Sequence, residues 1–142
     1  MVLREGIPEC FRVLREAGFE IWAFTAGGRD RIHGYFTSNS LPLEFDHVIS
    51  CDETRIGKPA LESYKALLAR WEGEECWFAA AHMWDVSAAK RAGFRGAWCS
   101  VWEGEACEGL FGGMDVVAGG FEEMAREVVR VSEEVGKGVE SG

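Results

Sequence analysis

The sequence predicts a doubly wound α/β protein whose strands form a parallel sheet. Short apolar runs alternate with helical patterns along the chain, and turn-forming residues separate them. The clearest unit covers residues 76–102, where an apolar run, a small-residue helix ending at Gly93 and a second apolar run follow one another. Strand, helix and strand in this order are typical of parallel sheets that carry helices on both faces.

The remaining elements continue this alternation. The predicted strands are residues 20–25, 45–51, 76–81, 95–102 and 115–118. The predicted helices are residues 7–17, 29–36, 59–71, 86–92 and 121–135. The predicted loops include residues 37–44, 52–59 and 103–113. We therefore expect one Rossmann-like domain over residues 1–135 and a frayed polar tail over residues 136–142.

Composition argues against several classes of partner. The 142 residues carry 24 acidic and 15 basic side chains, and the net charge of −9 argues against nucleic acid and anionic membranes. The longest apolar runs are far too short to cross a bilayer and no signal segment is recognised, so we expect a cytoplasmic protein. The five scattered cysteines form no C-x-x-C pair and are expected to be free thiols.

Three polar residues follow the ends of predicted strands and form a candidate site. Thr25 ends one strand, Lys58 lies in the loop after the next strand, and Asp85 follows the strand at residues 76–81. The carboxyl ends of parallel strands meet at one edge of the sheet, where ligands bind in such proteins. At this edge the Thr25 hydroxyl, with the backbone amides beside it, and the Lys58 ammonium can bind an anion. The Asp85 carboxylate can accept or donate a proton.

Each of these residues also has a structural interpretation. Thr25 fits an ordinary turn that caps the next helix, and Lys58 fits a solvated loop lysine. Asp85 fits the N-cap of the helix that follows it, a role that is compatible with a chemical one. His82, in the same turn, can hydrogen-bond an anion but is more often structural in such a place. Trp84 lies inside the turn and can form the wall of a pocket.

Four segments carry a resemblance to a known family. They are EGIPECFRVLREAGFEIWAFTAGG, IGKPALESYKAL, FAAAHMWDVSAAKRAGFRGAW and DVVAGGFEEMAREV. Together they resemble the haloacid dehalogenase superfamily, and within it the 2-haloacid dehalogenase-like branch. The first segment is similar to the family's Ser/Thr motif at Thr25, the second to its lysine motif at Lys58, and the third to its last acidic motif at Asp85. The resemblance extends from about Glu5 to Val129 and is most specific in the third segment.

The resemblance implies a hydrolase that works through an aspartyl ester and needs no metal. In the family an Asp displaces halide from C2 of a 2-haloacid, and water then hydrolyses the enzyme ester. Thr25 would bind the substrate carboxylate or orient the nucleophile, and Lys58 would keep the carboxylates ionised. Asp85 would pair with Lys58 and help to position the water. The residues that the resemblance places beside the substrate are Ala26, His82 and Trp84.

The chain departs from the family pattern in three ways. Ala26 stands where the family often has Asn, and His82 stands where characterised dehalogenases have Asn, which changes the expected halide site. The family's first motif, an apolar strand ending in D-x-[YF/D]-G-T, has no counterpart, and the helical cap that follows it is absent. We therefore expect a truncated core that lacks its first central strand, between the strands ending at Thr25 and Ala81, and little or no turnover by this chain alone.

Two other functions stay open at this point. A phosphatase of the same superfamily would use Mg²⁺, but no second acid follows Asp85 at the spacing of a G-D-x-x-x-D motif. A non-catalytic fragment would pair through its open sheet with another chain, either as a homodimer or with a complementing N-terminal segment. For the dehalogenase interpretation we expect a small carboxylate substrate, no cofactor and no metal ion.

Overall fold

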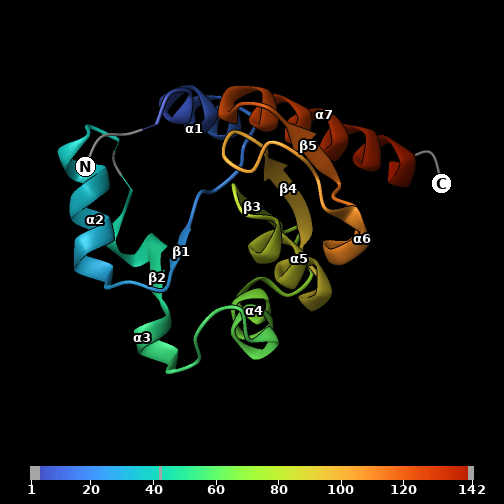
Figure 1. Ribbon diagram of the computed structural model, residues 1–142. Coiled ribbons are helices and arrows are strands. Elements are labelled where there is room, and N and C mark those ends of the chain that lie inside the picture. Colours follow the sequence, from blue (N-terminus) through green and yellow to red (C-terminus); the bar gives the residue numbers. More distant parts are fainter. Residues whose placement is uncertain (1–3, 42, 141–142) are drawn as a thin grey trace.

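In the computed structural model the chain is described over residues 4–41 and 43–140, and its elements alternate as the sequence predicts (Figure 1). The strands are β1 (Ala23–Thr25), β2 (Val48–Ser50), β3 (Trp77–Ala80), β4 (Arg95–Cys99) and β5 (Val116–Ala118). The α-helices are α1 (Ile7–Glu16), α2 (Arg29–Ser38), α3 (Cys51–Thr54), α4 (Leu61–Leu68), α5 (Met83–Ala92), α6 (Glu108–Phe111) and α7 (Phe121–Glu140). Two 3-10 helices are η1 (Phe45–His47) and η2 (Ala69–Trp71). The predicted α/β class is confirmed.

Every strand pairing is parallel, but the strands form two separate sheet pieces. β1 pairs with β2, where Phe24 lies opposite Ile49. β4 lies between β3 and β5, where Ala97 lies opposite both Ala79 and Val116. Among the described residues no pairing joins β1 to β3. The sheet is therefore divided between β1 and β3, at the position where the family resemblance implies that a central strand is missing.

Helices cover the two faces of the larger sheet piece. On one face α5, with α4 packed against it, covers a cluster that includes the buried Tyr64, Val86 and Trp98. On the other face α7 covers β4 and β5, and α1 lies beside α7 (Figure 1), around the buried Cys99 and Ala125. Because successive residues of a strand point to opposite faces, Trp98 and Cys99 belong to different clusters. The helices thus form two layers around the sheet.

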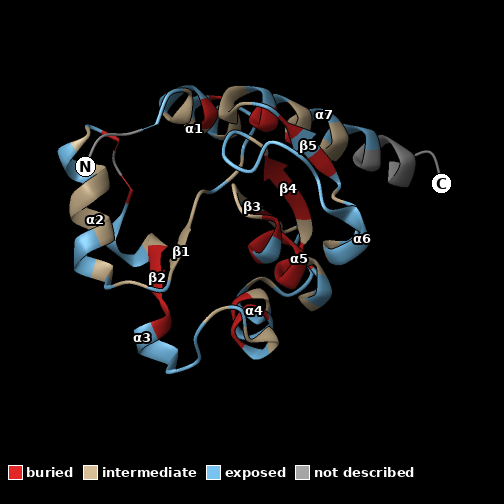
Figure 2. Ribbon diagram, in the orientation of Figure 1, coloured by how far each residue is buried: buried red, intermediate tan, exposed pale blue. Residues whose placement is uncertain are grey.

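Burial differs between neighbouring strands (Figure 2). All three residues of β2 are buried, and so are the last four residues of β4. The three residues of β1 are only half-buried, and β3 has one exposed residue, Ala79, in its interior. The two strands that border the division in the sheet are therefore the less protected ones.

Several element boundaries differ from those predicted. Residues 51–54 were expected to be strand end and loop but form α3, because the Ser50 hydroxyl accepts a hydrogen bond from the Asp52 amide (3.1 Å) and caps this helix. The strand predicted over residues 95–102 ends at Cys99, because Cys99 lies opposite the last residue of β5. The first strand is also shorter than predicted, because β1 pairs only with the three residues of β2.

The last helix extends beyond its predicted end. α7 continues to Glu140, whereas the sequence pattern predicted an end at Val135 and a frayed tail. Gly136 and Gly138 each weaken a helix by about 1 kcal/mol but do not terminate it here. Within residues 4–41 and 43–140, no helix combines the length and apolar character that crossing a bilayer requires. The five cysteines are free thiols, as predicted.

The packing of α5 on β4 leaves no room for a side chain at Gly96. A Cβ atom there would lie 2.6 Å from Val86 Cγ1 and 2.7 Å from Lys90 Cγ and Cδ. We expect Gly96→Ala to lower the free energy of unfolding by about 1–3 kcal/mol, because the buried Val86 must move. Urea unfolding followed by circular dichroism measures this loss. The control is Gly113→Ala, whose added Cβ meets nothing within 4 Å; equal midpoints for both variants would contradict the prediction.

Asp115 connects the start of β5 to β4 and α5. Its Oδ2 accepts a hydrogen bond from the Gly96 amide (2.7 Å) and lies 3.3 Å from Lys90 Nζ. Burial acts to raise the pKa of Asp115, but these two partners and the charge of Arg95 outweigh it and hold that pKa below its usual value. The ionised carboxylate therefore stabilises the fold at neutral pH, and this contribution is lost on acidification.

We expect this carboxylate to account for part of the acid sensitivity of the fold. Its stabilisation is complete above the unfolded pKa of Asp, about 3.9, and declines as the pH falls through the lower folded pKa. The variant Asp115→Asn should be less stable at neutral pH and should lose less stability between neutral pH and about pH 3. The midpoints of urea unfolding at several pH values across this range measure how stability changes with pH. Exposed Asp30→Asn is the control, and parallel pH profiles for Asp115→Asn and the unmodified chain would contradict this assignment.

Candidate active site

A buried ion pair between Lys58 and Asp85 forms the centre of the candidate site. Lys58 Nζ is 3.0 Å from Asp85 Oδ2, and each side chain is only 10% exposed. Lys58 comes from the loop between α3 and α4, whereas Asp85 lies in the first turn of α5. The structure thus brings together two of the three polar residues that the sequence places at the carboxyl edge of the sheet.

Tyr64 is the third member of this group. The sequence pattern predicted only that Tyr64 lies on the repeating apolar face of its helix. The residue is fully buried in α4, and its hydroxyl donates a hydrogen bond of 2.5 Å to Asp85 Oδ1. Burial raises the pKa of Tyr64 well above its usual value, and the hydrogen bond to Asp85 and the charge of Asp85 raise it further. The phenol therefore stays protonated. The sequence could have indicated this role, because a tyrosine predicted to be buried needs a hydrogen-bond partner for its hydroxyl.

Two aromatic rings from the separate sheet pieces lie near the ammonium group of Lys58. Lys58 Nζ is 4.9 Å from the ring centroid of Phe24 in β1 and 5.6 Å from that of Phe78 in β3. The two rings are themselves 6.5 Å apart in an edge-to-face arrangement. Rings at this distance attract a cation through their π faces. Lys58 is therefore positioned between the two sheet pieces by both ionic and aromatic contacts.

An aromatic surface lies beside Asp85 on the outside of the molecule. The rings of His82 and Trp84 stack with centroids 6.1 Å apart, and the ring of Trp102 lies 5.2 Å from that of His82. Trp84 is 39% exposed and Trp102 is 48% exposed. Trp84 directly precedes Asp85 in the chain, so this exposed surface and the buried ion pair come from the same turn of α5.

Glu103 fixes the turn that carries these residues, and nothing in its Gly- and Glu-rich loop indicated this role. Its Oε1 accepts hydrogen bonds from the Met83 amide (2.8 Å) and Trp98 Nε1 (3.0 Å), and its Oε2 is 3.7 Å from His82 Nδ1. Because Glu103 satisfies the first amide of α5, the helix begins at Met83 and not at residue 86. His82 is therefore the N-cap, and the interpretation of Asp85 as the N-cap is wrong.

Thr25 and Ala26 lie in the turn after β1. The Thr25 hydroxyl accepts a hydrogen bond from the Gly27 amide (2.9 Å), and the Ser50 hydroxyl donates to the Gly27 carbonyl (2.6 Å). These contacts hold the turn itself, and Ala26 is exposed at its tip. Phe24, one residue before Thr25, is the residue of β1 that lies near Lys58. Thr25 therefore makes its described hydrogen bond to its own turn, and among the described hydrogen bonds and ion pairs none joins it to Lys58 or Asp85.

The fold and this geometry define a class of protein. The chain is an α/β protein with a parallel sheet, and a buried lysine–aspartate pair lies beyond the carboxyl ends of its strands. Polar residues in this position form the ligand site of doubly wound sheets. Among the described residues, no group of three or more His, Cys, Asp or Glu side chains is placed to hold a metal ion.

Comparison with known proteins identifies the family. A family model described as haloacid dehalogenase-like hydrolase matches residues 2–93. This match covers more than half of the chain, so the chain belongs to the haloacid dehalogenase-like hydrolase family. The family resemblance recognised in the sequence is confirmed.

Relatives with assigned activities and structures are similar to parts of the chain. Haloacetate dehalogenase H-2 of Moraxella sp. (strain B) is 30% identical over 95 residues, which cover 61% of this chain and 40% of that protein. A dehalogenase structure with an intermediate complex has a TM-score of 0.75 at 19% identity and covers 87% of this chain and 55% of that one. A second dehalogenase structure has a TM-score of 0.72 at 17% identity, with 85% and 54% covered. The chain thus spans about half or less of the length of these relatives, and the structures support the fold.

The burial of the ion pair leads to a stability prediction. In Lys58→Met the Asp85 carboxylate stays buried with Tyr64 as its remaining described partner. We expect this variant to lose about 3–5 kcal/mol of unfolding free energy at neutral pH, and Lys58→Met/Asp85→Asn to recover part of it. Urea unfolding measures both. Lys65→Met, an exposed change in α4, is the control and should stay within about 0.5 kcal/mol of the unmodified chain; a similarly small loss in Lys58→Met would contradict the burial argument.

Proposed function

We propose that this chain supplies part of the active site of a hydrolase that cleaves the carbon–halogen bond of 2-haloacids, of the (S)-2-haloacid type. The observation that supports it most directly is the buried Lys58–Asp85 pair in a chain of the haloacid dehalogenase-like hydrolase family. The names of its relatives, a haloacetate dehalogenase and two dehalogenase structures, point to the same bond.

The proposed reaction has two steps. A carboxylate attacks C2 of the substrate, and a carbon–oxygen ester bond forms while the carbon–halogen bond breaks and halide leaves with the bonding electrons. Water then attacks the carbonyl carbon of this ester, and the acyl–oxygen bond breaks. The products are the 2-hydroxy acid, the regenerated carboxylate and one released proton. Each of these two steps has a lower barrier than the direct substitution of halide by water.

The polar residues have distinct roles in this proposal. The Lys58 ammonium stabilises the attacking carboxylate and the negative charge that develops during ester hydrolysis. Asp85, held by Lys58 and Tyr64, positions Lys58 and the hydrolytic water. Thr25 binds the substrate carboxylate or orients the nucleophile. The proposed reaction needs no cofactor and no metal ion.

Three further residues border the substrate in this proposal. The exposed ring of Trp84 supplies an apolar wall beside Asp85. His82, whose Nδ1 faces Glu103, has its Nε2 as a second group for an anion. Ala26 contributes no polar atom at the tip of the turn after β1, so the contact that Asn makes in other family members is not available from this side chain.

The attacking carboxylate is proposed to come from a segment outside the described residues. Both oxygens of Asp85 already accept hydrogen bonds, from Lys58 and Tyr64, so Asp85 is assigned to positioning and not to attack. The resemblance places the nucleophile on an apolar strand that this sequence lacks. We therefore propose that the 142-residue chain alone has little or no turnover.

A second candidate is a non-catalytic fragment that pairs with another chain. The specific observation that favours it is the division between β1 and β3, which leaves one edge of each strand without a strand neighbour among the described residues. In that case the Lys58–Asp85 pair serves only to hold α4 and α5 together. The two candidates differ in whether a complete sheet gives halide release.

A chimera tests the proposed activity. This chain, from Gly6 onward, is joined to the part of haloacetate dehalogenase H-2 that precedes the matching position. We expect the chimera to release halide from haloacetate and from (S)-2-chloropropionate, and the 142-residue chain alone to release none above background. Halide release is followed with a chloride-selective electrode. Lys58→Met in the chimera should lower kcat by at least about 100-fold, because an interaction with developing charge is lost.

The matched control is Lys65→Met in the same chimera, which should keep its activity because Lys65 is exposed on α4. A folded chimera that releases no halide but hydrolyses p-nitrophenyl phosphate with Mg²⁺ would replace the proposal with the phosphatase. A folded chimera with neither activity would favour the non-catalytic fragment.

A further inference from the structure

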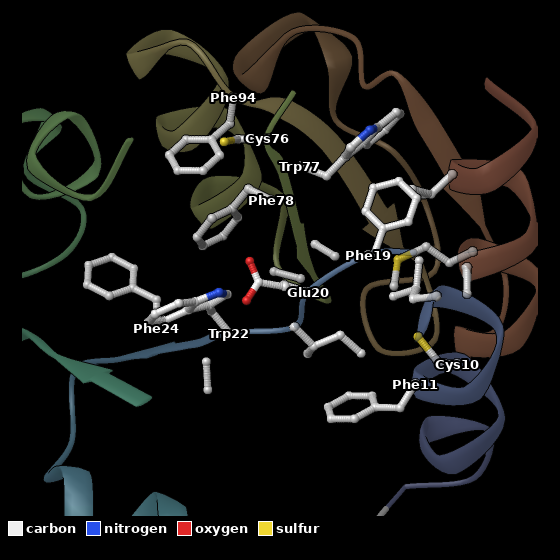
Figure 3. A pocket seen from close by; sticks show the side chains of 18 of the residues that line it. Cys10, Phe11, Phe19, Glu20, Trp22, Phe24, Cys76, Trp77, Phe78 and Phe94 are labelled. Atoms are coloured by element: carbon white, nitrogen blue, oxygen red, sulfur yellow. The ribbon is translucent and has the colours of Figure 1, made fainter. Parts of the chain in front are cut away.

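A groove with a volume of about 860 Å³ runs between the two pieces of the sheet (Figure 3). Most of the side chains that line it are apolar, and they include Phe24 and Phe78. Arg4, His82 and Trp102 lie outside this lining. These three residues belong to a different, exposed surface that carries a cation.

The guanidinium group of Arg4 lies on the face of the Trp102 ring. Its Cζ is 3.7 Å from the ring centroid, which is closer than in any other described pair of a cation and a ring. A guanidinium that stacks on a ring keeps its N–H donors at its edge, where an anion can reach them. Stacking also restricts the side chain before a ligand arrives, so that less conformational entropy is lost on binding.

The charge of Arg4 is not neutralised within the described chain. Among the described residues no carboxylate forms an ion pair with Arg4. Glu103, which follows Trp102, is engaged elsewhere: its Oε1 accepts hydrogen bonds from the Met83 amide and Trp98 Nε1. Arg4 itself is exposed. Its guanidinium group is therefore available to a ligand.

The segment that carries Arg4 is held at the carboxyl edge of the three-stranded sheet piece. Trp102 follows β4, and a Cβ atom at Gly6 would lie 3.6 Å from Phe121 Cβ, at the start of the helix that follows β5. The Ile7 amide donates a hydrogen bond to the Arg4 carbonyl (3.2 Å). Gly6 has a φ of 85°, a conformation that favours glycine, directly before α1 begins. Arg4 is thus fixed at the edge where ligands bind in such sheets.

His82 brings a second polar group to this surface. It follows β3, and its ring centroid lies 5.2 Å from that of Trp102, the ring on which Arg4 is seated. The ring of Trp84 stacks with that of His82 and is exposed. A guanidinium, an imidazole and two indole rings therefore form one continuous surface. Such a surface suits a small ligand with an anionic end and an apolar end.

We propose that Arg4 binds the carboxylate group of a small organic acid on this surface, through paired hydrogen bonds from its guanidinium group. The planar fork of a guanidinium matches the two oxygens of a carboxylate. A singly charged acid is favoured over a phosphate dianion, because the net charge of −9 and the neighbouring Glu5 and Glu103 repel a second negative charge. The ring of Trp102 orients the guanidinium, and His82 contributes the second polar contact.

The identity of this acid rests on the proposed function, whereas binding itself does not depend on turnover. If the acid is the 2-haloacid substrate, Arg4 takes its carboxylate and leaves Lys58 to the reacting carboxylate. Arg4 is then a substrate-binding residue that selects acids over neutral halogenated compounds.

Two fluorinated probes of similar size, trifluoroacetate and its neutral amide trifluoroacetamide, test this inference. Each is titrated into the 142-residue chain at low ionic strength, and fluorine NMR measures the bound fraction. We expect Arg4→Gln to weaken trifluoroacetate binding at least about fivefold and to leave the weaker binding of trifluoroacetamide unchanged. Arg4→Lys keeps the charge without the paired geometry and should recover part of the affinity.

Matched variants separate this surface from the rest of the molecule. Arg12→Gln removes an exposed arginine of α1 that pairs with Glu16 (3.2 Å), and it should leave both affinities unchanged. Trp102→Leu removes the ring that orients the guanidinium and should weaken trifluoroacetate binding at least about threefold. Circular dichroism confirms that each variant is folded; if Arg4→Gln does not fold, Arg4→Lys and Trp102→Leu decide.

Several outcomes would overturn the inference. Absence of trifluoroacetate binding to the unmodified chain, or equal binding by Arg4→Gln and Arg12→Gln, would show that Arg4 is not the anion-binding group. Equal losses for the charged and the neutral probe in Arg4→Gln would show that Arg4 only supports the local structure. Arg4-dependent binding together with an inactive chimera would support this surface and overturn only the proposed activity. Halide release by the chimera, with trifluoroacetate binding that Arg4→Gln does not change, would overturn only the role of Arg4.

Discussion

The arrangement of the two sheet pieces depends on the buried ion pair between Lys58 and Asp85. Lys58 follows the piece formed by β1 and β2, and Asp85 follows β3 in the other piece. Removing two charges from water costs several kcal/mol per ion, and only good geometry with further hydrogen bonds offsets this cost. The Tyr64 hydroxyl and the rings of Phe24 and Phe78 supply these further contacts. The pair therefore fixes the loop before α4 relative to α5.

Apolar packing then holds the pieces together although their backbones are not paired. Ile49 from β2 belongs to the same buried cluster as Tyr64 and Phe78, and Phe24 packs against that cluster. Side chains thus bridge the division near the candidate site, while the groove stays open between the strand edges. Compared with a continuous sheet, this divided sheet lacks main-chain hydrogen bonds between β1 and β3. Its helices stay packed, because each helix retains its own apolar contacts.

The fold class was predictable because alternating apolar runs and helical patterns reflect burial directly, and the position of the division was predictable through the family resemblance. Partners that lie far apart in sequence were not predictable. Helical spacing assigns Tyr64 to a face but does not name Asp85 as the group its hydroxyl reaches. The N-cap at His82 depends on Glu103, which lies twenty residues after Met83 in the chain. The local preference for Asp at N-caps therefore led to the wrong prediction that Asp85 is the cap. The cap of α3 by Ser50 was a local signal that the sequence did contain.

In the proposed function, the charge balance around Lys58 favours a substrate site whose anion-binding groups lie in separate turns. Lys58 and Asp85 neutralise each other, so a nucleophilic carboxylate beside Lys58 adds one uncompensated negative charge. A substrate carboxylate at the same ammonium would add a second in a poorly solvated place, where like charges repel strongly. The proposed function therefore assigns the substrate anion to other groups, at the turn of Thr25 and at His82. In this proposal Lys58 stabilises the reacting carboxylate, and the hydrogen bond from the Tyr64 hydroxyl stabilises part of the charge of Asp85, so that the ammonium can do so.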